Sequence, residues 1–228
     1  AENYPKVLGL LHAAKADLNL GDCHGQTPLL RAVRRSHLAT VQALLAARAD
    51  PDADYTGHTP IMDAAAIGDG EVTHTLASFK ADVNKTAANG TTPLRNAVDS
   101  NHVHAIQALL SAKANANVCL PLHAAAYEGN VLAVQVLLQG NADTKAYDRG
   151  PGATPLYKAV NRGNEDTVEA LLLADPSLLT EFSYHGNTLV SIAAERGWAG
   201  VVELLISAKA DPTVSNKADG WSPLHCAG

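Results

Sequence analysis

The stretch Thr27-Pro28-Leu29-Leu30-Arg31-Ala32-Val33 decides the fold, because related stretches recur along the 228 residues. The recurring mark is a Thr-Pro or Ser-Pro pair, or a degenerate version of it. Its further copies are Thr59-Pro60, Thr92-Pro93, Leu120-Pro121, Thr154-Pro155, Thr188-Leu189 and Ser222-Pro223. Successive copies are 32, 33, 28, 34, 34 and 34 residues apart. A nearly fixed period of this size indicates a repeat architecture in which each unit packs on its neighbours.

Each of these pairs predicts the start of a helix. A Thr or Ser hydroxyl can accept a hydrogen bond from a free N–H of the first turn, and Pro at the first helical position loses no hydrogen bond. An Ala-rich stretch follows, then a polar pause such as Gly163-Asn164, then a second apolar stripe ending in a pair such as Leu109-Leu110. The unit closes on Ala-Asp, as at Ala81-Asp82. We therefore expect each unit to be a helix, a turn, a second helix and a hairpin-like loop.

These stretches resemble the ankyrin repeat family, whose signature is Thr-Pro-Leu-His-x-Ala at a period near 33 residues. The signature His is kept at His123 and His225. The resemblance implies an all-α solenoid of stacked helix-turn-helix repeats, joined by short β-hairpin loops and curved into an α/α superhelix. We expect a single ankyrin-repeat domain over residues 1–228. Its partial repeats are 1–21 and 215–228, and its full repeats are about 22–53, 54–84, 85–117, 118–145, 146–180 and 181–214.

One loop and one helix depart from the pattern. Between Asn117 and Pro121 the projecting hairpin is either absent or missing from the sequence. In the second full repeat, Gly70, Thr75 and Ala77 stand where large apolar residues are expected. We therefore expect looser packing around residues 70–80.

A basic residue precedes the closing Ala-Asp, or its variant, where ankyrin repeats usually have Gly. These residues are Lys15, Arg48, Lys80, Lys113 and Lys209. Gly takes a left-handed backbone at no steric cost, so we expect these side chains to sit on left-handed residues. A cation at a helix C-terminus gains about 0.3–1 kcal/mol from the helix dipole, which offsets part of the strain. We prefer this interpretation to a row of positive charge that binds a partner.

Composition excludes several classes of function. The formal net charge is −6, whereas binding to nucleic acid needs a basic stripe. No stretch is apolar for long enough to span a bilayer. The three cysteines, Cys23, Cys119 and Cys226, have no metal-binding or redox spacing, so we expect free thiols in an intracellular, reducing compartment. The cytoplasm is our first expectation, with an organelle left open; we expect Cys23 to be exposed and Cys226 to be in the core.

The sequence predicts no catalytic, cofactor or metal site. No Gly-rich phosphate loop, paired carboxylates or nucleophile elbow is present. His102 and His104 are two residues apart, so on a helix they point to different sides. We expect neither an enzyme nor a cofactor.

The resemblance implies that a partner binds on the concave surface, which loop tips and the exposed sides of first helices line. The candidate residues are His24, Arg31, Arg34, Arg35, Tyr55, His58, Asp63, Asn96, Asp99, Tyr127, Lys158, Arg162, Tyr184, His185 and Trp221. Their charges change sign along the chain, from arginines through aspartates to Lys158 and Arg162. This pattern favours an extended or helical polypeptide of mixed charge.

The sequence therefore predicts a non-catalytic scaffold for protein–protein interaction, with no nucleic acid and no membrane insertion. Two alternatives stay open: a permanently bound subunit of a large assembly, and a regulatory or targeting domain of a longer enzyme or channel. The chain opens on a second-helix pattern and stops within a first-helix pattern, so we expect a fragment of a longer protein.

Overall fold

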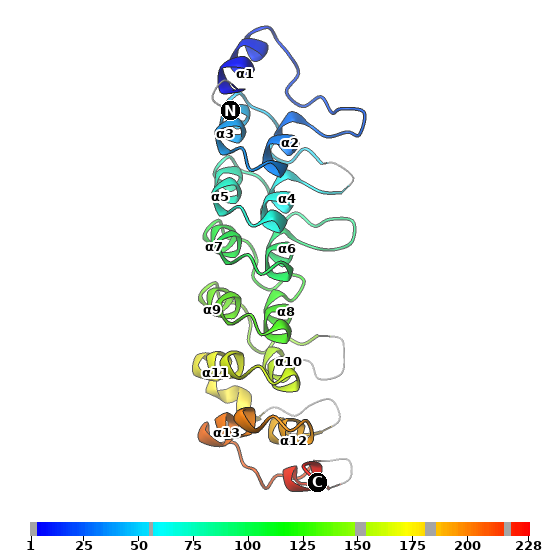
Figure 1. Cartoon of the computed structure of the whole chain (residues 1–228), viewed down its shortest axis with the longest axis vertical. Coiled ribbons are helices and arrows are strands. Elements are labelled where there is room, and N and C mark those ends of the chain that lie inside the picture. The colour runs from blue at the N-terminus through cyan, green and yellow to red at the C-terminus, as the bar shows by residue number, and fades with distance from the viewer. Residues whose placement is uncertain (1–3, 55–56, 149–153, 181–185, 217–219) are drawn as a thin grey trace. The chain divides into compact units, whose positions relative to one another are not determined.

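The computed structural model describes residues 4–54, 57–148, 154–180, 186–216 and 220–228. Within these ranges every regular element is a helix, and the helices follow one another in pairs. Two compact units are present, Ala1–Cys119 and Leu120–Gly228. In each unit the labels of Figure 1 form two columns, one of first helices and one of second helices. The all-α repeat fold predicted from the sequence is confirmed.

The helices of the first unit are α1 (Tyr4–Ala13), α2 (Pro28–Arg34), α3 (Leu38–Ala46), α4 (Pro60–Ile67), α5 (Gly70–Ser78), α6 (Pro93–Asp99) and α7 (Val103–Ser111). Those of the second are α8 (Pro121–Glu128), α9 (Val131–Gln139), α10 (Pro155–Arg162), α11 (Glu165–Ala174), the 3₁₀ helix η1 (Pro176–Thr180), α12 (Leu189–Glu195), α13 (Ala199–Ser207) and α14 (Pro223–Cys226).

The first helices begin where the sequence predicts. Thr27 and Thr92 each accept a hydrogen bond at 3.2 Å from the backbone N–H three residues on, and Thr154 and Thr188 do the same at 3.2 and 3.1 Å. Thr59 differs, because its buried hydroxyl makes no hydrogen bond. The Thr-Pro pair therefore works as a helix start through its capping hydroxyl at most copies, and through Pro alone at Thr59-Pro60.

Each unit is held together by contacts between equivalent helices of successive repeats. In the first unit α2, α4 and α6 pack in order, beside α1, α3, α5 and α7; in the second, α8, α10, α12 and α14 pack beside α9, α11 and α13. The core consists of small and branched side chains, such as Leu30, Ala64 and Ile106 in the first unit and Ala125 and Leu137 in the second. Repeats of this kind bury their apolar faces on each other and need no single large core.

The basic residues that follow the second helices are left-handed, as predicted. Their φ angles are 63° at Lys15, 69° at Arg48, 70° at Lys80, 67° at Lys113 and 74° at Lys209. Each lies just beyond a helix C-terminus, where a cation is favoured. The short loop after α7 is also left-handed at its end, with φ of 62° at Cys119 and 51° at Leu120.

The closing Asp of each repeat forms a side-chain turn. Asp17, Asp50 and Asp82 each accept the backbone N–H two residues on, at 2.9 Å, and the same turn recurs at Asn115, Asp143, Asp175 and Asp211. This explains why an Asp or Asn closes the repeat.

A ladder of side-chain hydrogen bonds connects successive loops of the first unit. Asn19 accepts the N–H of Asp50 at 2.8 Å, Asp52 accepts that of Asp82 at 2.9 Å, and Asn84 accepts that of Asn115 at 2.7 Å. The middle acceptor is thus a carboxylate where its neighbours are neutral amides. Partial burial raises the pKa of the Asp52 carboxyl above its ordinary 3.8, and the charges of Asp82 and Asp50 act in the same direction.

We predict that Asp52→Asn stabilises the first unit at neutral pH. The amide oxygen keeps the hydrogen bond from Asp82 N, and the substitution removes a disfavoured charge. Since Asp52 is only half-buried and solvent screens its charge, the gain is at most about 0.5 kcal/mol. A raised pKa in the folded state means that protonation of Asp52 favours folding, so the difference between the two proteins should vanish as pH falls below the ordinary carboxyl range. Urea unfolding at pH 7 and pH 3 measures both. Asn84→Asp is the reverse change and should destabilise; equal stability of all three proteins at pH 7 would refute the argument.

Side chains at the start of second helices cover the glycines that end first helices in the preceding repeat. Asn164 Nδ2 donates to the carbonyl oxygens of Ala126 and Tyr127 at 2.9 and 3.0 Å. The Trp198 ring lies over Gly163, so closely that a Cβ on Gly163 would be 2.6 Å from the nearest ring carbon. Trp198 is therefore a packing residue between repeats, although part of its ring remains exposed.

Candidate functional site

The first helices of both units bury one side and expose polar side chains on the other. In α4, Ile61 and Met62 are fully buried, Asp63 is half-buried and Ile67 is exposed. The helical period of 3.6 residues places such exposed positions on one side of each helix. The candidate residues on the first helices therefore share equivalent places in successive repeats.

In the first unit, the structure brings predicted site residues together as ion pairs. Arg34 of α2 pairs with Asp63 of α4, and Arg95 pairs with Asp99 at 2.7 Å within α6. The Arg95 guanidinium also donates to the Cys119 carbonyl. Asp63 and Asp99, the two acidic residues predicted for this surface, thus each pair with an arginine. The negative charge expected between the basic groups is therefore neutralised locally.

The other candidates of the first unit differ in exposure. His24, Arg31 and Arg35 are exposed, whereas His58 and Asn96 are half-buried. Hydrogen bonds from the backbone N–H groups of Gln26 and His24 lower the pKa of the Asp22 carboxyl, and the charge of Arg31 adds to this. The loop before α2 therefore presents a stable carboxylate next to the first arginine.

In the second unit, one contact joins candidates of two repeats, and another holds a candidate within its own repeat. The Arg162 guanidinium carbon lies 4.6 Å from the centroid of the Tyr127 ring, within the range of a cation–π interaction. Lys158 of α10 pairs with Asp148 at 3.2 Å. Trp221, before α14, is exposed. Tyr127 and Arg162 together form a composite aromatic and cationic surface.

Three candidates, Tyr55, Tyr184 and His185, lie outside the described residues. The structure adds Arg95, Asp148 and the exposed Tyr147, which the sequence reasoning did not select. Arg95 was detectable, because it stands four residues before Asp99 on a predicted helix. Asp148 has no such signal, because its contact with Lys158 depends on the path of the loop.

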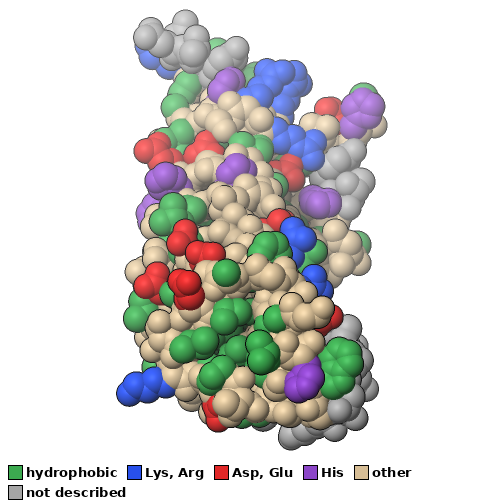
Figure 2. Space-filling model, turned by 60° about the horizontal axis from the view of Figure 1, so that its bottom comes forward, with side chains coloured by type: hydrophobic (Ala, Val, Ile, Leu, Met, Phe, Trp, Pro, Cys, Tyr) green, Lys and Arg blue, Asp and Glu red, His purple; other side chains and the backbone are tan. Residues whose placement is uncertain are grey.

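Other kinds of site find little support. In the part of the chain that the structure describes, no group of three His, Cys, Asp or Glu side chains could hold a metal ion. None of the three cysteines, all within the described residues, is in a disulfide; Cys23 is exposed as expected, but Cys226 is half-buried, so its expected core position is wrong. The reason is that Cys226 ends a four-residue helix. On the face shown in Figure 2, Lys and Arg side chains form small separate groups, and a larger group of Asp and Glu side chains lies on the left. Among the described helices, none combines the length and apolarity that a membrane span requires.

Known proteins with similar sequences and structures carry the same repeats. A profile of the family described as "Ankyrin repeats (3 copies)" matches residues 1–87, 61–148, 94–179 and 156–228. NF-kappa-B inhibitor delta of Mus musculus is 29% identical over 218 residues, which are 91% of this chain and 64% of that protein. Ankyrin repeat domain-containing protein 63 of Mus musculus is 39% identical over 109 residues, which are 46% of this chain and 28% of that protein. This chain thus spans less than two thirds of either relative.

Among solved structures, the ankyrin repeat domain of Bcl-3 matches with a TM-score of 0.78 and 25% identity, over 90% of this chain and 95% of that domain. The matches of the family profile overlap and together extend from residue 1 to residue 228. The chain belongs to the ankyrin repeat family.

Proposed function

We propose that the chain is a non-catalytic scaffold that binds a polypeptide partner through the exposed sides of its first helices and the adjoining loops. Ankyrin repeats generally mediate protein–protein interaction. The relative NF-kappa-B inhibitor delta is named for inhibiting another protein, which agrees with a binding function. The surface proposed here is the set of candidate residues given above.

One observation carries the proposal most directly. The outer sides of the first helices carry side chains of different chemistry: arginines on α2, the half-buried Asp63 and the exposed Ile67 on α4, Tyr127 on α8 and Arg162 on α10. The buried sides, in contrast, are mostly apolar, with His123 of α8 and Ser191 of α12 as polar exceptions. A rigid frame with a varied exposed side can be specific for a partner without any chemistry of its own.

The residue types suit the centre of an interface. Arg, Tyr and Trp carry a large share of binding energy in protein complexes. The Tyr127–Arg162 contact holds two of these side chains in place. Because these side chains are already ordered, less side-chain entropy is lost when a partner binds there. Trp221 offers a third anchor in the same unit.

We predict that combined replacement of Arg31, Arg35 and Trp221 by Ala weakens the binding of protein partners. Because these side chains are exposed, folding should be preserved, and bound partner should fall at least about tenfold. The measurement is quantitative co-purification at physiological salt, with the stoichiometry of each companion determined. The matched control replaces Gln107 and Glu169, which are exposed on second helices, and should retain the companions.

Each outcome has a meaning for the proposal. Companions that survive the triple replacement would contradict binding through the first helices and loops. Companions at fixed stoichiometry that depend on these residues would favour a permanently bound subunit, whereas substoichiometric ones would favour a reversible adaptor.

A further inference from the structure

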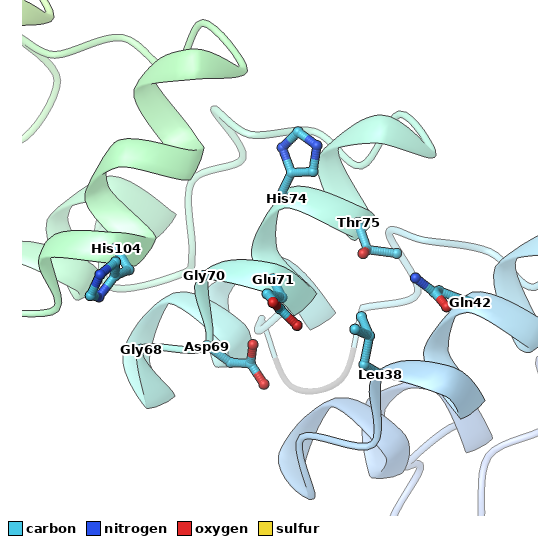
Figure 3. A pocket seen from close by; sticks show the side chains of 9 residues that line it. All are labelled: Leu38, Gln42, Gly68, Asp69, Gly70, Glu71, His74, Thr75 and His104. Carbon is cyan, nitrogen blue, oxygen red and sulfur yellow. The ribbon is translucent and has the colours of Figure 1, made fainter.

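The first unit has a hollow on the side of its second helices, away from the first-helix candidates. Its volume is about 660 Å³, and its lining comes from α3, from the turn and first half of α5, and from the start of α7 (Figure 3). The lining residues are Leu38, Gln42, Gly68, Asp69, Gly70, Glu71, His74, Thr75 and His104. The hollow lies in the segment where the sequence lacks large apolar residues.

Gly70 lies at the edge of the hollow, at the start of α5. At the start of the neighbouring second helices, the equivalent residues are Leu38 in α3 and Val103 in α7. A Cβ on Gly70 would be 3.0 Å from the Cβ of His104, so α7 approaches at the place where Gly70 has no side chain. Gly70 therefore lets α7 pack closely against the start of α5.

The lining contains two carboxylates and two imidazoles, those of His74 and His104. It includes the carboxylates of Asp69 and Glu71 and no Lys or Arg. Figure 3 shows both carboxylates pointing from the start of α5 toward Leu38 of α3. Asp69 accepts the N–H of Val72 at 3.0 Å with one oxygen, and Glu71 is exposed, so both keep acceptor capacity for a ligand.

A threonine side chain also lines the hollow. Thr75 is only 8% exposed, and among the described residues no hydrogen bond ends on its hydroxyl. In Figure 3 the methyl end of the Thr75 side chain points toward Gln42 of α3, and the hydroxyl oxygen points the other way. The side chain is buried as a whole, but its oxygen is not among the fully buried atoms, so a ligand in the hollow can donate a hydrogen bond to it.

We propose that this hollow binds an arginine side chain of a polypeptide partner. Leu38 offers an apolar surface for the methylene stem, and the two carboxylates face the guanidinium. The Thr75 hydroxyl and the Gln42 amide oxygen accept its remaining N–H groups. The guanidinium carries five donors and no acceptor, which complements a lining of acceptors. A metal ion does not fit, because no group of three suitable ligands occurs among the described residues.

The proposal is tested by titrating the whole chain with the peptide acetyl-Gly-Ser-Arg-Ser-Gly-amide and following backbone amide signals by NMR. We expect saturable shifts at the amides of residues 68–75 and at Leu38 and Gln42. The same peptide with citrulline in place of arginine keeps the shape but loses the charge, and should bind at least about fivefold more weakly.

Variants locate the site. Glu71→Gln should lower the affinity for the arginine peptide by about fivefold. Thr75→Val, which keeps the shape of the side chain, should lower it by about two- to threefold. The control Asp166→Asn changes the equivalent second residue of α11 in the other unit and should leave binding unchanged.

Three results would overturn the proposal: no saturable shift, equal binding of the citrulline peptide, or equal weakening by Asp166→Asn and Glu71→Gln, which would indicate attraction to acidic surface in general. The peptide replaces the natural partner, so these results are independent of the co-purification test of the first helices.

Discussion

Leu137→Ala is expected to lower the free energy of unfolding of the second unit by about 2–5 kcal/mol. Leu137 is 0% exposed in α9, and its side chain belongs to the layer that joins second helices. The smaller side chain loses apolar burial and leaves a cavity that the surrounding helices fill only in part. Because neighbouring repeats are stabilised by their contacts, the loss should extend to α11. Urea denaturation followed by circular dichroism measures the total effect, and amide exchange measures its spread.

The same helix contains a matched control. Leu132 is 60% exposed, so Leu132→Ala removes the same atoms from water instead of from the core and should change stability by less than about 0.5 kcal/mol. Leu109 is the corresponding buried residue of α7, and Leu109→Ala should destabilise the first unit to a similar extent. Equal effects of Leu132→Ala and Leu137→Ala would show that α9 is not packed as described.

Gly163→Ala should destabilise the second unit by about 2–5 kcal/mol, from two causes. Gly163 has a φ of 75°, where an Ala residue is strained by about 1–2 kcal/mol. The new methyl group would also be 2.6 Å from the Trp198 ring, which must move, and such overpacking adds about 1–3 kcal/mol. Thermal and urea unfolding give the size, and the fluorescence of the indole reports whether its ring has moved.

Gly197→Ala separates the two causes. Gly197 has a similar φ of 72°, but an added Cβ there meets nothing within 4 Å. Only the backbone strain of about 1–2 kcal/mol should appear, without a change in Trp198 fluorescence. If both variants lose the same stability, the contact between Trp198 and Gly163 contributes nothing.

Local features of the fold were accessible from the sequence because they depend on neighbouring residues. A Thr hydroxyl caps the N–H three residues on, so Thr27 and Thr154 mark their helices without any tertiary information. The left-handed Lys80 follows from the same kind of reasoning about a helix end. The single domain expected over the whole chain stays a prediction.

Contacts between repeats were harder to predict, because they depend on how one helix is rotated against the next. Arg34 and Asp63 are 29 residues apart, and the sequence presented them as opposite charges in different repeats instead of as a pair. Tyr127 and Arg162 stand seven and eight residues after the first residue of their helix-start pairs. Because these positions are not equivalent in the repeat, the sequence alone did not indicate that the two side chains are in contact. The hollow at Gly70 was visible only as an absence of large side chains, and its carboxylates and Thr75 hydroxyl needed the structure.

The left-handed basic residues also determine where trypsin-like proteases meet the first unit. Lys15, Arg48, Lys80 and Lys113 are exposed just after successive second helices, so a peptide bond that such enzymes recognise lies at the same place in each repeat. Cleavage at these bonds would separate the repeats at their loops while leaving each pair of helices intact. The residue that ends each second helix thereby also marks where the repeat can be divided from the next.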